Sequence, residues 1–395
     1  MPKIQNLARL LFVACLASAV SVMPQAAAAK RFTIVHRFLP SEAKYPSGGL
    51  IADAAGNLYG VTRGGGIKNK RCRHSGPGCG VVYRIAADGT FSQLYAFQGD
   101  TDGFAPYGNL LLDGGGNLYG TTMEGGAFSD SGGTVFKIAA DGTKTTLHSF
   151  GSSGDGAIPL AGLIADSAGN LYGTTDGGGP NGGAGGTVFR IAPGGTETVL
   201  YSFCALANCA DGQGPRARLL LDGTGDLYGT TEEGGVFNKG TVFKLANNGV
   251  FSVVYSFGAQ PNDGSQPRAG LIADTAGNLY GDTAFGGHNN SGTLFRIAPN
   301  GSETILYDGF SFDGPNGLDP EAELLLDGQG NLFGTAGYTL FRLRPNGNFK
   351  VLHTFNDRDP DPVGQLLPLN GYLYGVTEGG SRRESCCGVV YSLNP

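Results

Sequence analysis

Short apolar runs separated by glycine-rich polar turns recur along the whole chain. One such unit has runs at residues 110–112, 117–122, 134–138 and 143–150. Apolar and polar residues alternate within the runs, and β-branched and aromatic side chains are common, which favours strands over helices. The turns carry Asp-Gly and Gly-Gly pairs, which supply the side-chain caps and positive φ angles that tight hairpins require. Each unit is therefore predicted to form a sheet of four short antiparallel strands.

This unit is repeated along the chain. The motif Asn-Leu-Tyr-Gly, or a close variant, places its aromatic residue at Tyr59, Tyr119, Tyr172, Tyr228, Tyr280, Phe333 and Tyr374. The spacings are 60, 53, 56, 52, 53 and 41 residues, so the variation falls in loops between similar units. Repetition of a four-stranded antiparallel unit is typical of a β-propeller, in which each sheet is one blade.

The two ends of the repeat array complement each other. Residues 32–38 match only the fourth strand of a unit, whereas the seventh unit stops after its third strand at residues 389–393. Pairing these segments would complete the last sheet and remove two exposed strand edges. The sequence therefore predicts an all-β, seven-bladed propeller over residues 30–395, with the N-terminal strand closing the ring.

The first 29 residues are predicted to be a secretory signal peptide. Lys3 and Arg9 precede an apolar stretch at residues 10–22, and three alanines at 27–29 offer a cleavage site before Lys30. The stretch is short for a membrane span of ~20 residues, and no later segment is apolar for long enough. We expect a secreted or periplasmic protein without an integral membrane anchor.

Composition narrows the possible functions. The chain contains 70 glycines among 395 residues, yet 40% of its residues are hydrophobic, which argues against disorder. The net charge is −6, and removal of the leader would make it −8. An acidic protein lacks the basic footprint of a nucleic-acid-binding protein, so no nucleic-acid partner is expected.

The repeat resembles a known family. The order Asp-x-x-Gly-Asn-Leu-Tyr-Gly-Thr-Thr, Gly-Gly, Gly-Thr-Val-Phe-x-Ile/Leu and Leu-Tyr-Ser-Phe is similar to the tandem repeat of the choice-of-anchor GloVer-containing proteins. The resemblance covers the chain after its leader and implies an exported bacterial repeat protein without an established activity. The C-terminal anchors for which that family is named have no counterpart before Pro395, so free secretion or periplasmic residence is expected.

The loops predict which face of the propeller carries a site. Turns between strands one and two and between three and four are short, whereas the strand two–three loops and the blade connections are long and variable, so we expect function on the long-loop face. The connections carry an Asp-Gly pair before a proline, at Asp102, Asp155, Asp211, Asp263 and Asp313. Such carboxylates are possible Ca²⁺ ligands. Because each lies in a different blade, we interpret them mainly as turn residues, and no cofactor other than Ca²⁺ is expected.

Charged residues follow these prolines in three consecutive blades. They are Arg216, Arg218, Arg268, Glu321 and Glu323. The first strands of a propeller line its channel, so these side chains are candidates for a polar ligand pocket at the channel mouth. The simpler alternative is a set of salt bridges between blades. A second candidate is a basic patch of the first and seventh blades, made of Lys68, Lys70, Arg71, Arg73, Arg382 and Arg383, with a solvated loop as its alternative.

The six cysteines after the leader suit an oxidising compartment. We predict bonds Cys204–Cys209 and Cys72–Cys79. Cys386 and Cys387 either bond to each other or reach across to the first blade. His36, His148 and His353 share one repeat position that other units fill with tyrosine, which indicates strand packing rather than catalysis.

Two functions remain open. The first is a non-catalytic exported propeller that binds a polysaccharide or a protein through its long-loop face. The second is a lyase or hydrolase acting on a polysaccharide or a lactone at the channel mouth. Propellers host both kinds of function, so the fold does not choose. The regularity of the repeats favours binding, and no residue is assigned a catalytic role.

Overall fold

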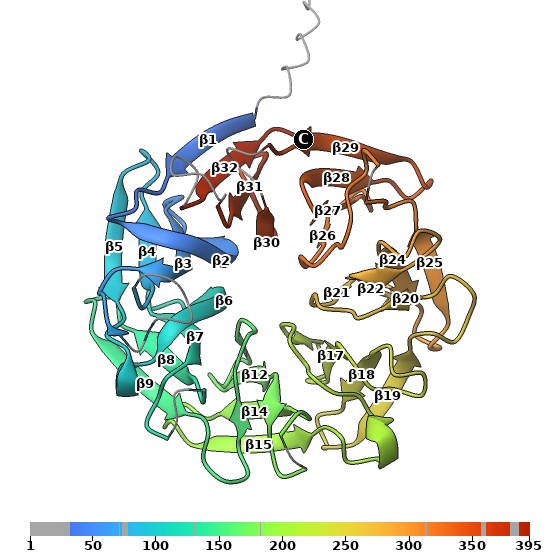
Figure 1. Ribbon diagram of the computed structural model, residues 1–395, viewed down its shortest axis with the longest axis horizontal. Coiled ribbons are helices and arrows are strands. Elements are labelled where there is room, and N and C mark those ends of the chain that lie inside the picture. The colour runs from blue at the N-terminus through green and yellow to red at the C-terminus, as the bar shows by residue number, and fades with distance from the viewer. Residues whose placement is uncertain are drawn as a thin grey trace, which may run out of the picture.

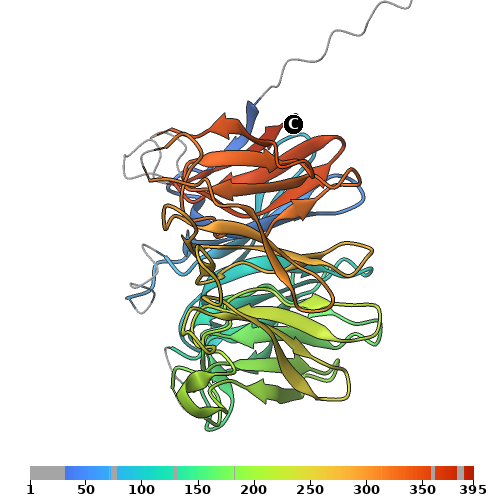
Figure 2. The ribbon, with the colours of Figure 1, turned by 90° about the vertical axis from the view of Figure 1, so that its right-hand side faces the viewer.

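The chain folds into a ring of small sheets around a central axis. The computed structural model describes residues 32–70, 72, 78–128, 131–181, 183–312, 314–356, 361–379 and 387–395. Within them, seven four-stranded antiparallel sheets form the blades of a propeller (Figure 1). Viewed edge-on, the ring is a disc with loops on its two faces (Figure 2). The predicted all-β, seven-bladed architecture is confirmed.

The strands follow the chain blade by blade. Blade 1 contains β2 (Ala43–Ala52), β3 (Leu58–Gly65), β4 (Val81–Ile85) and β5 (Phe91–Ala96), and blade 2 contains β6 (Phe104–Leu112), β7 (Leu118–Glu124), β8 (Thr134–Ile138) and β9 (Lys144–Ser149). Blade 3 contains β11 (Ile164–Ala165), β12 (Leu171–Thr175), β14 (Thr187–Ile191) and β15 (Glu197–Ser202), and blade 4 contains β16 (Leu220–Leu221), β17 (Leu227–Thr231), β18 (Thr241–Leu245) and β19 (Phe251–Ser256). Blade 5 contains β21 (Ile272–Ala273), β22 (Leu279–Thr283), β24 (Thr293–Ile297) and β25 (Glu303–Tyr307), and blade 6 contains β26 (Leu325–Leu326), β27 (Leu332–Ala336), β28 (Thr339–Leu343) and β29 (Phe349–Thr354).

Blade 7 joins the two ends of the described chain. It contains β30 (Pro362–Leu369), β31 (Tyr372–Thr377), β32 (Val389–Leu393) and, on its outer edge, β1 (Phe32–Arg37). β1 runs antiparallel to β32, with Phe32 opposite Leu393 and Arg37 opposite Val389 (Figure 1). The predicted closure of the ring by the N-terminal strand is therefore confirmed, whereas the predicted signal peptide lies outside the described residues.

The loops of the long-loop face contain several short elements. The two-residue strands β10 (Gly156–Ala157) and β13 (Gly177–Gly178) pair in blade 3, as β20 (Gly264–Ser265) and β23 (Phe285–Gly286) do in blade 5. Two 3₁₀ turns, η2 (Asp100–Asp102) and η3 (Ala207–Cys209), lie in blade connections. Among the residues that the structure describes, no helix is long and apolar enough to span a membrane.

One aromatic contact holds every pair of neighbouring blades together. A phenylalanine just after the fourth strand packs on a ring of the third strand of the next blade, with ring centroids 4.9–5.7 Å apart. The pairs are Phe38–Tyr83, Phe97–Phe136, Phe150–Phe189, Phe203–Phe243, Phe257–Phe295, Phe310–Phe341 and Phe355–Tyr391. Tilted and edge-to-face contacts of this kind are the favoured geometry of aromatic rings. The contact explains why the phenylalanine recurs in every repeat.

Disulfides fasten two of the long loops. Cys72 bonds to Cys79 with a Cα–Cα distance of 5.1 Å, and Cys204 bonds to Cys209 with a distance of 4.0 Å. Both predicted pairs are confirmed. Cys387 is also disulfide-bonded, and Cys386 lies outside the described residues. A bond from Cys387 to the first blade is excluded, because both cysteines of that blade are bonded to each other.

Candidate functional site

In each blade, two residues face the channel at fixed positions after a proline, namely the first and the third. The prolines lie before or within the first strands and are Pro46, Pro106, Pro159, Pro215, Pro267, Pro320 and Pro362. The residue directly after each proline lines one cavity at the long-loop end of the channel; the seven are Ser47, Tyr107, Leu160, Arg216, Arg268, Glu321 and Val363. The third residue after the proline lies about two strand residues deeper, or ~7 Å along an extended chain. The repeat therefore builds two layers, which we call the mouth pocket and the belt.

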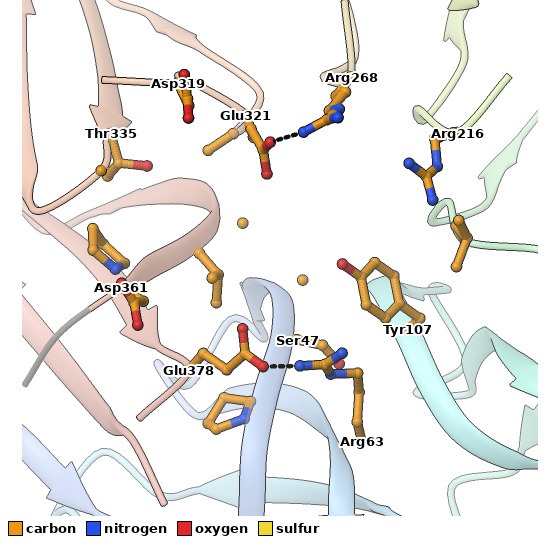
Figure 3. A pocket seen from close by; sticks show the side chains of 18 of the residues that line it. Ser47, Arg63, Tyr107, Arg216, Arg268, Asp319, Glu321, Thr335, Asp361 and Glu378 are labelled. Atoms are coloured by element: carbon orange, nitrogen blue, oxygen red, sulfur yellow. Dashed lines mark hydrogen bonds and ion pairs between the residues drawn. The ribbon is translucent and has the colours of Figure 1, made fainter. Parts of the chain in front are cut away.

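The mouth pocket is a cavity of about 670 Å³. Residues near the ends of the second strands complete its wall, including Arg63 within β3 and Glu378 directly after β31 (Figure 3). Its lining carries three arginines against four carboxylates, so the pocket is slightly acidic.

Alternating charges run along one side of the mouth pocket. Arg216 pairs with Asp176 of blade 3, at 3.3 Å from Nε to Oδ1, and with Glu232 of blade 4, at 2.6 Å from Nη1 to Oε2. Arg268 continues the series, with its Nε 2.8 Å from Oε1 of Glu232 and its Nη1 bonded to Glu321 (Figure 3). These five residues form a ladder over blades 3–6 in which both guanidinium groups are neutralised.

The other side of the pocket contains carboxylates without partners. Arg63 pairs with Glu378, but the side chains of Asp319 and Asp361 form no hydrogen bond or ion pair within the described part of the chain (Figure 3). Burial, and then the charge of Glu321, raises the pKa of Asp319 above its ordinary value. Asp319 and Asp361 are therefore the lining carboxylates most available to a ligand.

An apolar wall completes the pocket. It consists of Tyr107, Met123 and Leu160 from blades 2 and 3. The ring of Tyr107 points its hydroxyl into the cavity, and the guanidinium of Arg63 lies 5.8 Å from the ring centroid (Figure 3). A planar apolar surface thus shares one cavity with free carboxylates.

The belt crosses the channel below the mouth pocket. Arg218 forms two hydrogen bonds with Glu323, one of them 3.0 Å from Nε to Oε2, although the two residues belong to blades 4 and 6. Gln365 of blade 7 donates to Oε1 of Glu323 at 2.9 Å, Asn109 of blade 2 donates to Gln365 at 3.4 Å, and the backbone N–H of Gly49 donates to Asn109. A second cavity of about 630 Å³ lies on the far side and is lined by Arg218, Glu323 and Gln365. These three residues do not line the mouth pocket. We therefore conclude that the belt separates the two cavities and forms the floor of the mouth pocket.

The predicted channel residues thus fall into two groups. Arg216, Arg268 and Glu321 line the mouth pocket, whereas Arg218 and Glu323 belong to the belt. The salt bridges between blades that were the simpler alternative are present. Sequence reasoning missed Arg63, Tyr107, Asp319, Asp361 and Glu378, together with the belt residues Asn109 and Gln365. The available signal was the number of residues from the proline that recurs in each repeat, since it assigns Tyr107 to the mouth pocket and Asn109 and Gln365 to the belt.

The Asp-Gly carboxylates hold their own loops. Asp102, Asp211 and Asp263 each accept a bond from a tyrosine hydroxyl of the preceding strand, at 2.9, 2.8 and 2.8 Å, and Asp155 bonds Nε2 of His148 at 3.3 Å. All four also accept backbone N–H bonds from the adjacent turn. Asp313 lies outside the described residues, and no group of three metal-ligating side chains occurs within them. The interpretation as turn residues fits these contacts, and it explains why tyrosine and histidine interchange at the neighbouring position.

The proposed basic patch is only partly described. Lys68 and Lys70 are exposed on the long loop of blade 1. Arg71, Arg73, Arg382 and Arg383 lie outside the described residues. The patch as a unit therefore stays a prediction.

Fold and pocket together define a seven-bladed propeller with a floored, mixed-charge pocket on its long-loop face. The chain belongs to the Gloeobacter/Verrucomicrobia repeat family, whose model matches residues 21–219 and 186–391. No curated protein matches the chain.

Several solved structures are similar to the chain. A catalytically inactive virginiamycin B lyase from Staphylococcus aureus, solved with quinupristin, is 14% identical, with 92% of this chain and 99% of that chain covered and a TM-score of 0.63. A streptogramin B lyase is 14% identical, with 92% and 97% covered and a TM-score of 0.60. The extracellular domain of a hybrid two component system from B. thetaiotaomicron is 14% identical, with 92% and 41% covered and a TM-score of 0.56. At this identity, the likenesses show the fold alone.

Proposed function

We propose that this protein is an exported, non-catalytic propeller that binds a chain end or a short segment of a polysaccharide in the mouth pocket. The observation that carries the proposal is the placement of Tyr107 in the same floored cavity as the unpartnered carboxylates Asp319 and Asp361. Disulfides form in oxidising compartments, which supports export.

The pocket has the chemistry that a sugar ring requires. One face of a pyranose is apolar and fits an aromatic surface such as that of Tyr107. Its hydroxyl groups are hydrogen-bond donors, and carboxyl oxygens such as those of Asp361 accept such bonds. The cavity volume of about 670 Å³ falls within the ~300–1,000 Å³ typical of small-molecule sites. The excess of carboxylates favours a neutral or amine-bearing sugar over a uronic acid.

Binding without cleavage is supported by the state of the charged groups. The three arginines of the lining are each paired with a carboxylate, and Glu321 and Glu378 are each paired with an arginine. The second candidate is a lyase or hydrolase in which Asp319, with its raised pKa, would donate a proton. The similarity to lyases supports this candidate only at the level of fold.

A glycan array on the purified protein tests the proposal. Retained glycans are then titrated calorimetrically and incubated with the protein, and the mixture is examined for products by chromatography. We expect Tyr107→Ala and Asp361→Asn to weaken binding at least about tenfold, which corresponds to the loss of roughly 1.4 kcal/mol.

The matched control is Tyr372→Ala. Tyr372 is 42% exposed and lies at the start of β31, away from the pocket lining, so its removal should leave affinity unchanged. Retention without products supports binding, whereas product formation that Asp319→Asn abolishes establishes the enzymatic candidate instead. Equal loss in the control and in Tyr107→Ala would place binding outside the mouth pocket.

A further inference from the structure

Blade 5 carries an acid at a position where blades 2, 3, 4 and 6 carry threonine and blades 1 and 7 carry valine. In blades 2, 3 and 4 this position holds Thr121, Thr174 and Thr230. Their hydroxyls donate to the backbone carbonyl of the second residue after the next blade's proline, namely Ala161, Ala217 and Ala269, at 3.0, 3.1 and 3.0 Å. In blade 5 the residue is Asp282 on β22, and the corresponding carbonyl in blade 6 is that of Ala322. A hydroxyl donor is thus replaced by a group that donates only when it is protonated.

The surroundings of Asp282 oppose its ionisation. The residue is 1% exposed, and neither carboxyl oxygen has a hydrogen-bond partner among the described residues. The charged groups that act on it are Glu321 and Glu323, the ladder and belt members of blade 6, and both are negative. Their guanidinium partners, Arg268 and Arg218, are bonded to those two glutamates. Burial, and then the two glutamates, raises the pKa of Asp282 well above its ordinary value.

We propose that Asp282 is a positioning residue kept as a neutral carboxylic acid, which allows the ladder and the belt to share blade 6. In this state blade 6 offers two carboxylates to two guanidinium groups. Loss of the proton places a third negative charge beside Glu321 and Glu323, with no cation left to compensate it. Loss of the proton from Asp282 should therefore destabilise the ladder and the belt.

The proton on Asp282 belongs to the unliganded protein, whatever the pocket binds. Native Asp282 holds a proton that the unfolded chain has released above its ordinary pKa. The native state therefore binds one proton more, and the stability of the wild type falls as the pH rises. Asp282→Thr introduces the residue that blades 2, 3, 4 and 6 carry and removes this contribution.

Urea unfolding of wild type and Asp282→Thr between about pH 5 and pH 8 measures the effect. The unfolding constant of the wild type, divided by that of the variant, should rise with pH, at most about tenfold for each pH unit while native Asp282 keeps its proton. Glu303→Gln serves as a control for other groups that titrate in this range, because it lies on the outer strand β25. The unfolding constant of Glu303→Gln, divided by that of the wild type, should be the same whether residue 282 is Asp or Thr in both proteins.

A second measurement reports the protonation state directly. With ¹³C-labelled aspartate, the infrared difference spectrum of wild type minus Asp282→Asn should show the C=O band of a protonated carboxyl at neutral pH. Asp282→Asn is isosteric, so the spectrum can be recorded even if Asp282→Thr folds poorly. Parallel pH curves for wild type and Asp282→Thr, or a carboxylate band in the difference spectrum, would overturn the proposal.

Discussion

Replacing Arg218 by leucine tests whether the belt is a buried, closed floor. Its partner Glu323 is only 8% exposed, and after the substitution it would keep a single side-chain donor, Gln365 at 2.9 Å. Removing one member of a buried ion pair typically costs about 3–5 kcal/mol, because an unpaired charge remains. The Arg218 side chain is itself 33% exposed, so water can reach part of the vacated space. We therefore expect Arg218→Leu to lower the free energy of unfolding by about 2–3 kcal/mol.

A double-mutant cycle separates the pair from the loss of packing. Glu323→Leu leaves a partly exposed cation and should cost less, about 1 kcal/mol. The double leucine variant leaves no unpaired charge, so the coupling energy from urea unfolding should be about 2 kcal/mol. The pair Arg216–Asp176 is the control, since its side chains are 36% and 26% exposed. Its coupling energy should be below about 1 kcal/mol.

Two results would show that the belt is not a closed floor. If Arg218→Leu costs less than about 0.5 kcal/mol, or if the two cycles give equal coupling energies, Glu323 is solvated from the channel. The mouth pocket would then open into the second cavity, and a polysaccharide could thread the ring instead of entering by its end. A lower m-value in the single variant would show that the native state had loosened rather than lost one pair.

Three further predictions concern the frame around the site. Gly120→Ala should cost about 1–3 kcal/mol in urea unfolding, because the added Cβ would lie 2.7 Å from a buried ring, whereas Gly114→Ala, with no atom within 4 Å, should be neutral. Replacing both Cys204 and Cys209 by serine should cost about 2 kcal/mol for a sequence separation of 5, and an unchanged thermal midpoint would contradict this. Burial and a nearby carboxylate raise the pKa of Glu303 to about 7, so its contribution to stability is present at acidic pH and is lost as the pH rises to neutrality. Glu303→Gln should flatten that decline in melting temperature, and an unchanged slope would count against the shift.

The ring itself was predictable because its signals are local and repeated. Asp and Gly at each turn, and an aromatic residue after each fourth strand, recur in unit after unit. The closure by residues 32–38 followed from counting strands, since an incomplete unit at one end matched a surplus strand at the other. Both features depend only on recognising which segments are strands and which strand of the repeat each one is, and short stretches of sequence are enough for that.

The site was less predictable because it depends on depth within the channel. Arg216 and Arg218 are two residues apart and were assigned to one mouth, yet an extended chain advances ~7 Å over that interval. One arginine therefore lines the pocket while the other forms the floor. Asp319 and Asp361 escaped notice because they precede their prolines in irregular connections, where no periodicity indicates direction. Asp282 was not singled out from the sequence, because only the structure shows that its carboxyl group is buried.

Seven identical blades would present the same residues to the channel seven times. A pocket that binds one ligand in one orientation therefore requires the blades to differ. On one side of the ring the first strands approach backbone to backbone; a Cβ on Gly48 would lie 2.4 Å from the carbonyl carbon of Gly108. The long strands β2 and β6 accordingly reach toward the axis side by side (Figure 1). On the other side, Arg218 and Glu323 fill the remaining space with side chains. Glycines in one half of the ring and an ion pair in the other thus close the channel with one floor. Above this floor, the residues directly after the prolines differ from blade to blade and line one pocket.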